Sequence, residues 1–218
     1  MSKNETGSSR AKETRAEIVS AAVAALKRGE VIAFPTETLY GLGADALNAA
    51  AVEKVFQLKG RKAANPIPVL VADREMLLHL VSNISGVGEK LIAQFWPGPL
   101  TIIFPARRGI PKRLVNANGG VGVRISSQPI TGELLKALGR PLTATSANPS
   151  GQLAARTAQE AKEYFSGEIG IFIDGGKLTS KTGSTVVELV GDTLRIIRTG
   201  DIDRSQLEGV LGAERILA

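Results

Sequence analysis

Residues 31–45 read VIAFPTETLYGLGAD, and this stretch decides the fold class. The apolar run over residues 31–34 predicts a short buried strand that stops at Pro35. Two threonines and a glutamate follow at once, where α/β proteins place their binding loops, and paired glycines let the backbone approach a neighbour closely. The stretch predicts such a loop, or else a capped turn in which Thr36 and Thr38 hydrogen-bond the local backbone.

Helix and strand patterns alternate along the rest of the chain. A Thr-x-x-Glu capping box at Thr14 opens the first helix, and Gly29 closes it. Further helices are predicted over residues 49–59, 73–81, 88–95, 130–138 and 157–165 and after residue 201, and further strands over residues 67–72, 99–105, 121–126, 141–145, 169–174, 184–189 and 193–198. Short turns such as Gly191-Asp192 join neighbouring strands, so the sheet is not purely parallel. We expect an α/β fold with a twisted mixed β-sheet flanked by helices.

The chain has the size and composition of one packed domain. It has 218 residues, of which 43% are hydrophobic, and residues 14–218 show neither an internal repeat nor a shift in composition. Residues 1–13 are polar and have nothing to bury, so they are predicted to be a flexible tail. We therefore expect one domain over residues 14–218.

Several classes of protein are excluded by residue types that are rare or missing. There is no cysteine and only one histidine, His79, which excludes disulfides, a thiolate nucleophile, iron–sulfur clusters and a multi-histidine metal centre. No resident metal site is therefore expected. The chain also lacks an apolar run of about twenty residues and a hydrophobic signal sequence, so we expect no membrane contact and a cytoplasmic location.

The positive charges are unevenly distributed. Lysine and arginine number 27 against 21 aspartates and glutamates, a net charge of +6. No acidic residue lies between Glu89 and Glu133, and that stretch holds six cations: Lys90, Arg107, Arg108, Lys112, Arg113 and Arg124. A second cluster comprises Lys59, Arg61 and Lys62. Unopposed positive charge attracts the phosphates of nucleotides or nucleic acids, although residues 107–113 could also be a solvated basic loop.

Lys59 and Arg61 flank Gly60 at the end of a predicted helix. Because Gly60 frees the backbone, both side chains could clasp one polyphosphate, with the arginine fork binding two oxygens. The alternative is that the two cations only complement the helix dipole.

Arg124 and Arg198 lie in apolar strands, where a guanidinium needs an anionic partner. Aspartate or glutamate could fill that role, and so could the carboxylate or phosphate of a ligand. Small hydroxyl and amide side chains also gather over residues 143–151 and 183–185, where they can cradle an anion. Phosphate-loop, dinucleotide-binding and His-Glu-x-x-His motifs are missing from the sequence. The residues alone therefore predict an α/β protein that binds an anion such as a polyphosphate.

Together these segments resemble the YrdC-like family, the threonylcarbamoyl-AMP synthases, from about residue 14 to residue 202. The markers occur in order: Phe34-Pro35-Thr36-Glu37-Thr38-Leu39-Tyr40-Gly41-Leu42-Gly43, Lys59-x-Arg61, Trp96-Pro97-Gly98-Pro99-Leu100-Thr101, Val123-Arg124, Ser146-x-Asn148, Asp174-Gly175-Gly176, Gly183-Ser184-Thr185-Val186 and Arg198-x-Gly200. Each marker is weak alone, but the ordered set is specific. The resemblance implies a YrdC-like fold over residues 14–218.

The resemblance also implies a reaction and a set of site residues. L-Threonine, bicarbonate and ATP would give threonylcarbamoyl-AMP and pyrophosphate, and a separate transferase would then modify an adenosine beside the tRNA anticodon. ATP would be held by Lys59, Arg61, Asn65, Ser146, Asn148 and Arg198, of which Lys59 and Arg61 are the expected catalytic residues. Threonine would be held by Thr38, Arg124, Ser184 and the backbone at Ala144. Mg²⁺ would arrive with ATP, and the chemistry would consist of positioning and charge neutralisation.

A binding module without catalysis is the alternative interpretation. The basic residues would then grip tRNA, ribosomal RNA or other double-stranded RNA, and the enzyme itself could also contact tRNA. RNA-binding surfaces usually add stacking aromatic side chains, and only Trp96 and Tyr40 lie near the basic clusters in the sequence. Such a module would give no reason for Arg124 in a strand or for the hydroxyls of Ser146 and Ser184, so the enzyme is favoured.

Overall fold

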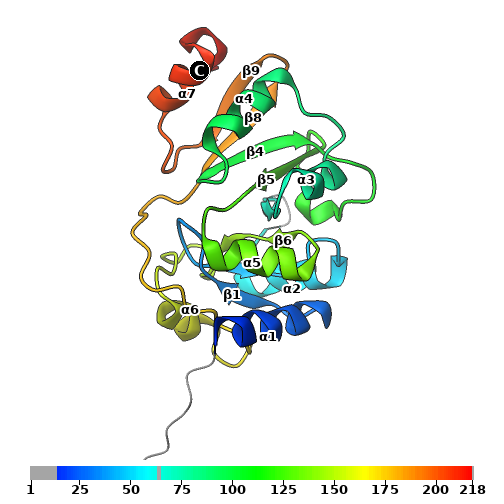
Figure 1. Cartoon of the computed structure of the whole chain (residues 1–218), viewed down its shortest axis with the longest axis vertical. Helices are drawn as coiled ribbons and strands as arrows, with labels where there is room; N and C mark the ends of the chain where they lie inside the picture. The colour runs from blue at the N-terminus through cyan, green and yellow to red at the C-terminus, as the bar shows by residue number, and fades with distance from the viewer. Residues whose placement is uncertain (1–13, 63–64, 218) are drawn as a thin grey trace, which may run out of the picture.

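The computed structural model describes residues 14–62 and 65–217, and the predicted tail over residues 1–13 lies outside the described residues. The helices are α1 (Arg15–Lys27), α2 (Ala49–Lys59), α3 (Arg74–Leu80), α4 (Gly86–Phe95), α5 (Pro129–Leu138), α6 (Ala158–Phe165) and α7 (Arg204–Leu211), with short 3₁₀ turns η1 (Lys112–Leu114) and η2 (Ala213–Arg215). The strands are β1 (Ile32–Phe34), β2 (Gly41–Gly43), β3 (Val69–Leu70), β4 (Leu100–Pro105), β5 (Gly120–Arg124), β6 (Leu142–Thr143), β7 (Thr145–Ser146), β8 (Thr185–Val190) and β9 (Thr193–Arg198). Figure 1 shows their arrangement.

The strands form two hydrogen-bonded sheets. One has the order β6-β3-β5-β4-β8-β9, and the other has the order β1-β2-β7. The pairs β3/β5 and β4/β8 are parallel, whereas β3/β6, β4/β5 and β8/β9 are antiparallel, so the larger sheet is mixed. Asp45, which follows β2, forms an isolated bridge with Leu142 on β6. The predicted α/β class with a mixed sheet is confirmed, with the pairing divided between two sheets.

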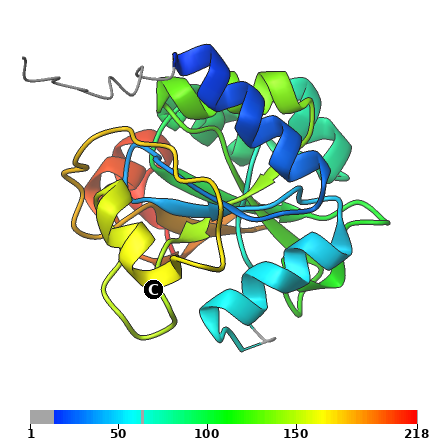
Figure 2. The ribbon, with the colours of Figure 1, turned by 90° about the horizontal axis from the view of Figure 1, so that it is seen from below.

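Helices cover both sides of the strands. In Figure 2, α1 and α5 lie together on one side of the strands, and α2 and α6 lie on the other. The alternation along β1 explains this arrangement, because Ile32 and Phe34 pack with the side chains of α1 and α5, whereas Ala33 packs with those of α2 and α6. Successive side chains of a strand point to opposite faces, so a strand that is apolar throughout needs cover on both.

The larger sheet carries its polar side chains on one face. Ile102 on β4 and Val123 on β5 are register partners and belong to the core that also includes residues of α4 and α7. Thr101 and Arg124 are their neighbours in sequence, so the pleat directs both to the opposite face. Gly122, the register partner of Ile103, adds no side chain to that face. Arg124 on this face lines the site.

Three strand predictions differ from the structure. Residues 169–174 do not form a strand, because Phe172 bridges Ala33 at a single position. Residues 41–43 form β2, which was not predicted, and a Cβ at Gly43 would come within 2.8 Å of the Phe34 ring. The strand predicted over residues 141–145 divides at Ala144 into β6 and β7, which belong to different sheets. None of the described helices is long and apolar enough to cross a membrane.

Candidate functional site

Segments far apart in sequence converge on one cavity of about 110 Å³, lined by both sheets. Six of the predicted site residues line it: Arg61, Arg124, Ala144, Ser146, Ser184 and Arg198. The remaining lining residues are Thr36, Leu39, Tyr40, Gly41, Pro68, Thr145 and Gly183. The predicted gathering of cationic and hydroxyl side chains is therefore present in the fold.

Arg124, at the end of β5, forms the most deeply buried part of the site. Its side chain is 5% exposed and pairs with the carboxylate of Glu37, while Ser126 donates to the other carboxylate oxygen. Burial, with a smaller contribution from the charge of Arg198, lowers the pKa of Arg124 to about 10, so the guanidinium stays charged at neutral pH. Glu37 and Ser126 were not predicted as site residues, although the need of a strand arginine for an anionic partner pointed to such a carboxylate.

Arg198, at the end of β9, holds the segment that carries Ser184. Its Nε and Nη2 atoms donate to the Ser184 carbonyl at 3.2 and 2.7 Å, and Nη2 also lies 3.1 Å from Ser184 Oγ. The Ser184 hydroxyl is in turn 3.0 Å from Thr101 Oγ1. Arg198 thus brings a charge to the cavity and fixes Ser184 at its wall.

Arg61 lies just beyond α2, where Gly60 adopts the left-handed conformation that ends the helix. Its Nε atom donates to the Asn65 carbonyl at 2.8 Å, and Nη2 donates to the Pro66 carbonyl at 3.2 Å. Burial lowers the pKa of Arg61, and the charge of Arg198 lowers it further. The Asn65 side chain is exposed and does not line the cavity, so Asn65 meets the site only through its backbone.

Lys59 lies behind the cavity wall and does not line the cavity. Its ammonium donates to the carbonyls of Ser146 and Asn148 at 2.5 and 2.7 Å, and it lies 3.4 Å from Asn148 Oδ1. The Asn148 side-chain amide donates to the carbonyls of Pro149 and Gln152. Burial lowers the pKa of Lys59 to about 8, with a smaller contribution from the charge of Arg61. In this structure Lys59 fastens the segment that brings Ser146 to the cavity.

Thr38, like Lys59, does not line the cavity but contacts a residue that does. It is buried, and its hydroxyl lies 3.0 Å from the hydroxyl of Thr36, which lines the cavity. The Thr36 hydroxyl also donates to the Leu39 carbonyl at 2.7 Å and accepts from the Thr38 amide. The sequence allowed either a binding loop or a capped turn here. The structure has features of both, because the threonines hydrogen-bond within their own turn and that turn borders the cavity.

Tyr40 ties the loop around residue 175 to the same wall. Its hydroxyl donates to the Gly176 carbonyl at 2.8 Å and accepts from the Gly175 amide at 2.9 Å. The Asp174 carboxylate lies 3.2 Å away. The Asp-Gly-Gly marker is therefore joined to the threonine loop through one buried hydroxyl.

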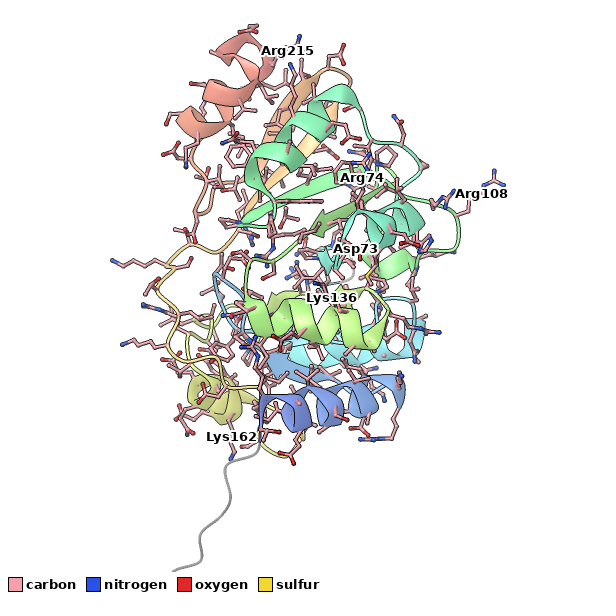
Figure 3. The ribbon with its side chains drawn as sticks, viewed as in Figure 1. Asp73, Arg74, Arg108, Lys136, Lys162 and Arg215 are labelled. Atoms are coloured by element: carbon pink, nitrogen blue, oxygen red, sulfur yellow. The ribbon has the colours of Figure 1, made fainter. Side chains whose placement is uncertain are left out.

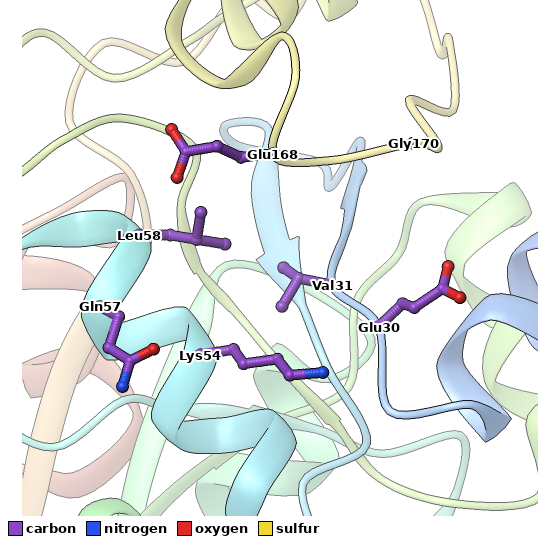
Figure 4. Close-up of a pocket in the computed structure, with 7 residues that line it drawn as sticks. All are labelled: Glu30, Val31, Lys54, Gln57, Leu58, Glu168 and Gly170. Carbon is purple, nitrogen blue, oxygen red and sulfur yellow. The ribbon is translucent and has the colours of Figure 1, made fainter.

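A larger hollow of about 540 Å³ lies elsewhere, beside α2. Its polar side chains are Lys54, Gln57, Glu30 and Glu168, and it contains none of the predicted site residues (Figure 4). The Lys54 ammonium donates to the Gly29 carbonyl at 2.8 Å. The smaller cavity is the better candidate, because three guanidinium groups converge on it and none of the described residues that line the larger hollow is an arginine.

The basic residues do not form one continuous surface. Lys59 is buried, and Arg113 is paired with Glu53 at 2.8 Å and stacked on the Phe56 ring. Arg108 projects from the fold (Figure 3). Within the described ranges, no group of three or more histidine, aspartate and glutamate side chains is arranged to hold a metal ion.

Comparison with known proteins matches the chain to one family. The family model Sua5_yciO_yrdC, described as telomere recombination, matches residues 24–200. A threonylcarbamoyl-AMP synthase of Pyrococcus abyssi is 38% identical over 191 residues, which are 88% of this chain and 56% of the relative. A putative threonylcarbamoyl-AMP synthase of Mycobacterium tuberculosis is 33% identical over 202 residues, which are 93% of each chain. The crystal structure of P. abyssi Sua5 complexed with L-threonine matches with a TM-score of 0.88 at 36% identity and covers 95% of this chain and 61% of that chain. The chain thus spans little more than half of the archaeal relative and nearly all of the mycobacterial one.

Proposed function

The chain belongs to the Sua5/YrdC family, and from that premise we propose that it is a threonylcarbamoyl-AMP synthase. It makes threonylcarbamoyl-AMP from L-threonine, bicarbonate and ATP and releases pyrophosphate, the first step of N6-threonylcarbamoyladenosine formation in tRNA. One observation carries this proposal: Arg61, Arg124 and Arg198 converge with two serines on one cavity. Such a cluster of cations and hydroxyls suits a substrate that combines a carboxylate with phosphates.

Threonine binds at the Arg124 end of the cavity. The guanidinium receives the amino-acid carboxylate, and Ser184 lies on the same wall. The amide of Ala144 is already donated to the Pro68 carbonyl at 2.8 Å, which leaves the Ala144 carbonyl to accept from the α-ammonium. Thr38 supports the adjoining turn through Thr36.

ATP binds at the end of the cavity formed by Arg61, Ser146 and Arg198. Lys59, Asn65 and Asn148 support this end, because each is bonded to a lining residue or its segment. A neighbouring hollow of about 500 Å³ shares Leu39 with the cavity and includes Leu153 and Ala154, which gives room for the remainder of the nucleotide. Magnesium arrives with ATP as part of that substrate.

The reaction needs no nucleophile from the protein. The amine of threonine adds to bicarbonate, and loss of water gives a carbamate. A carbamate oxygen then attacks the α-phosphorus of ATP, and the bond to the departing pyrophosphate breaks. Arg61 neutralises charge on the departing phosphates, and Lys59 adds a second positive charge from behind the cavity wall. These two residues are the proposed catalytic pair. Positioning and charge neutralisation account for most of the barrier lowering in such phosphoryl chemistry.

The product is a mixed anhydride of a carbamate and a phosphate, which reacts readily with water. A transferase that accepts it and delivers the threonylcarbamoyl group to tRNA is therefore the proposed partner. Direct RNA contact by Arg107, Arg108 and Lys112 is a second proposal, but Arg113 is already neutralised by Glu53 and Lys59 is buried. These contacts weaken the interpretation of the chain as an RNA-binding module without catalysis.

Pyrophosphate release tests the two functions directly. The purified chain is incubated with ATP and bicarbonate, with and without L-threonine. We expect threonine-dependent pyrophosphate, lost in Arg61→Ala and Lys59→Ala and retained in Lys136→Ala, which changes an exposed cation on α5 (Figure 3). Unchanged release in the first two variants would contradict the site. No turnover, together with RNA affinity that falls steeply with salt, would favour the binding module.

A further inference from the structure

Thr101 lies directly behind Ser184 and belongs to a sequence marker that the proposed mechanism does not use. Its hydroxyl is 3.0 Å from Ser184 Oγ, and the residue is only 1% exposed. The parallel pairing of Leu100 with Thr185 fixes the register between β4 and β8, so it holds the two hydroxyls side by side. This contact is built into the sheet and does not depend on a loop.

The available hydrogen-bond partners decide which hydroxyl donates. Ser184 Oγ accepts from Arg198 Nη2 at 3.1 Å, because a guanidinium can only donate. Within the described part of the chain, Ser184 is the only side chain or backbone group that bonds the Thr101 hydroxyl. If Ser184 donated to Thr101, the Thr101 proton would be buried without an acceptor, which is costly. Thr101 therefore donates to Ser184.

Two donors then occupy the acceptor sites of the Ser184 oxygen, and its own proton remains free. Ser184 lines the cavity, so this proton is directed to whatever binds there. We propose that Thr101 is a positioning residue that makes Ser184 a donor only, so that Ser184 binds an anionic oxygen and rejects an ammonium group. This assignment rests on the proposed function: the anionic oxygen belongs to the carboxylate of threonine and not to a phosphate of ATP. Thr101 thereby helps to fix which way round the amino acid binds.

The test compares two variants. Thr101→Val keeps the shape of the side chain but loses the hydroxyl that donates to Ser184, and Thr101→Ser keeps that hydroxyl and its hydrogen bond to Ser184. Threonine and ATP affinities and steady-state kinetics are measured for each and for Ser184→Ala. In Thr101→Val, the acceptor site of Ser184 that Thr101 occupied becomes free, so the Ser184 hydroxyl loses its fixed direction. The KM for threonine then rises about tenfold while kcat and the KM for ATP change little. Thr101→Ser restores the KM. The double variant Thr101→Val/Ser184→Ala binds threonine no worse than Ser184→Ala alone, because Thr101 acts through Ser184.

Several outcomes would overturn the inference. A normal threonine KM in Thr101→Val, with a raised KM in Ser184→Ala, removes the role of Thr101 and leaves the proposed function intact. An effect on ATP in place of threonine shows that the oxygen belongs to a phosphate. Equal losses in Thr101→Val and Thr101→Ser, with a lowered melting temperature, show a packing role only. Absence of threonine binding and turnover in the unaltered chain overturns both the inference and the proposed function.

Discussion

Arg124 and Glu37 form a buried ion pair beside the cavity, with the guanidinium on the last residue of β5 and the carboxylate on the loop that follows β1. Ser126 donates to the other oxygen of Glu37, so the carboxylate is held on two sides. Among the described residues, Glu37 alone accepts from the Arg124 guanidinium. The remaining nitrogens of Arg124 are therefore available to a ligand, and Glu37 holds the group in place before the ligand arrives.

Glu37→Gln tests this pair. The amide keeps the size of the side chain but removes the charge, so the buried guanidinium loses its counter-ion. We expect the free energy of unfolding to fall by about 3 kcal/mol and the KM for threonine to rise. Urea unfolding and kinetics measure both effects. The control is Glu30→Gln, which removes the charge from the exposed pair with Arg28 and should leave stability nearly unchanged. Equal effects of the two changes would contradict the role of Glu37.

The pKa of Lys59 predicts how ATP binding depends on pH. Burial lowers this pKa to about 8 in the free protein, and bound phosphates favour the protonated form. The complex therefore holds more protons than the free protein above that pH, so affinity for ATP falls as pH rises, by up to about tenfold per unit. Calorimetric titration between about pH 7 and pH 9.5 measures it. Lys59→Met should bind ATP more weakly without this dependence, and an equally steep decline in that variant would assign it to another group.

Two arginines on β9 allow a controlled test of the nucleotide site, because only one of them lines the cavity. Arg198 lines the cavity, whereas Arg195 pairs with Glu188 at 3.5 Å outside it. Arg198→Ala should weaken ATP binding by tenfold or more, since a charge-assisted contact contributes roughly 1.5–3 kcal/mol. Arg195→Ala should bind ATP normally. The dissociation constants of the two variants measure the difference, and similar losses would indicate only a general field effect.

Gly200 makes room for the segment that carries Ser184. A Cβ at this position would lie 2.3 Å from the Gly183 carbonyl oxygen and 2.4 Å from the Ser184 carbonyl carbon. Gly200→Ala should therefore displace Ser184, cost about 2 kcal/mol in stability and weaken threonine binding. Gly209→Ala, at an exposed position of α7 where a Cβ meets nothing, should instead stabilise the fold by about 0.5–1 kcal/mol. Thermal unfolding compares them, and a harmless Gly200→Ala would show that the segment yields easily.

Local chemistry made most of the elements predictable from the sequence. The capping boxes at Thr14 and Thr157 begin α1 and α6 as expected, and Gly60 ends α2 in the left-handed conformation. Strand β2 was missed because glycine is unusual in a strand, and the Phe34 ring that leaves little room for a Cβ at Gly41 or Gly43 is visible only in the structure. Residues 169–174 were wrongly predicted as a strand, since their apolar side chains meet the core without a ladder of hydrogen bonds.

The site was predictable as a set of segments and less so as a set of contacts. Unusual polar residues after strands identified the segments that line the cavity, including Arg124 and Ser184. The sequence could not show that Lys59 bonds two backbone carbonyls, or that Glu37 is the partner of Arg124. Those relationships join residues about ninety positions apart, and tertiary packing alone determines them.

We propose that the cavity joins threonine, the carbon of bicarbonate and the adenylyl group of ATP in one product. To test this, ¹³C-bicarbonate is supplied with ATP and L-threonine, and the nucleotides are followed by mass spectrometry. We predict one adenylate that contains both the threonine and the labelled carbon, is missing when threonine is omitted, and is lost in Arg61→Ala. Pyrophosphate or AMP released without a labelled threonine-containing adenylate would contradict the proposed function.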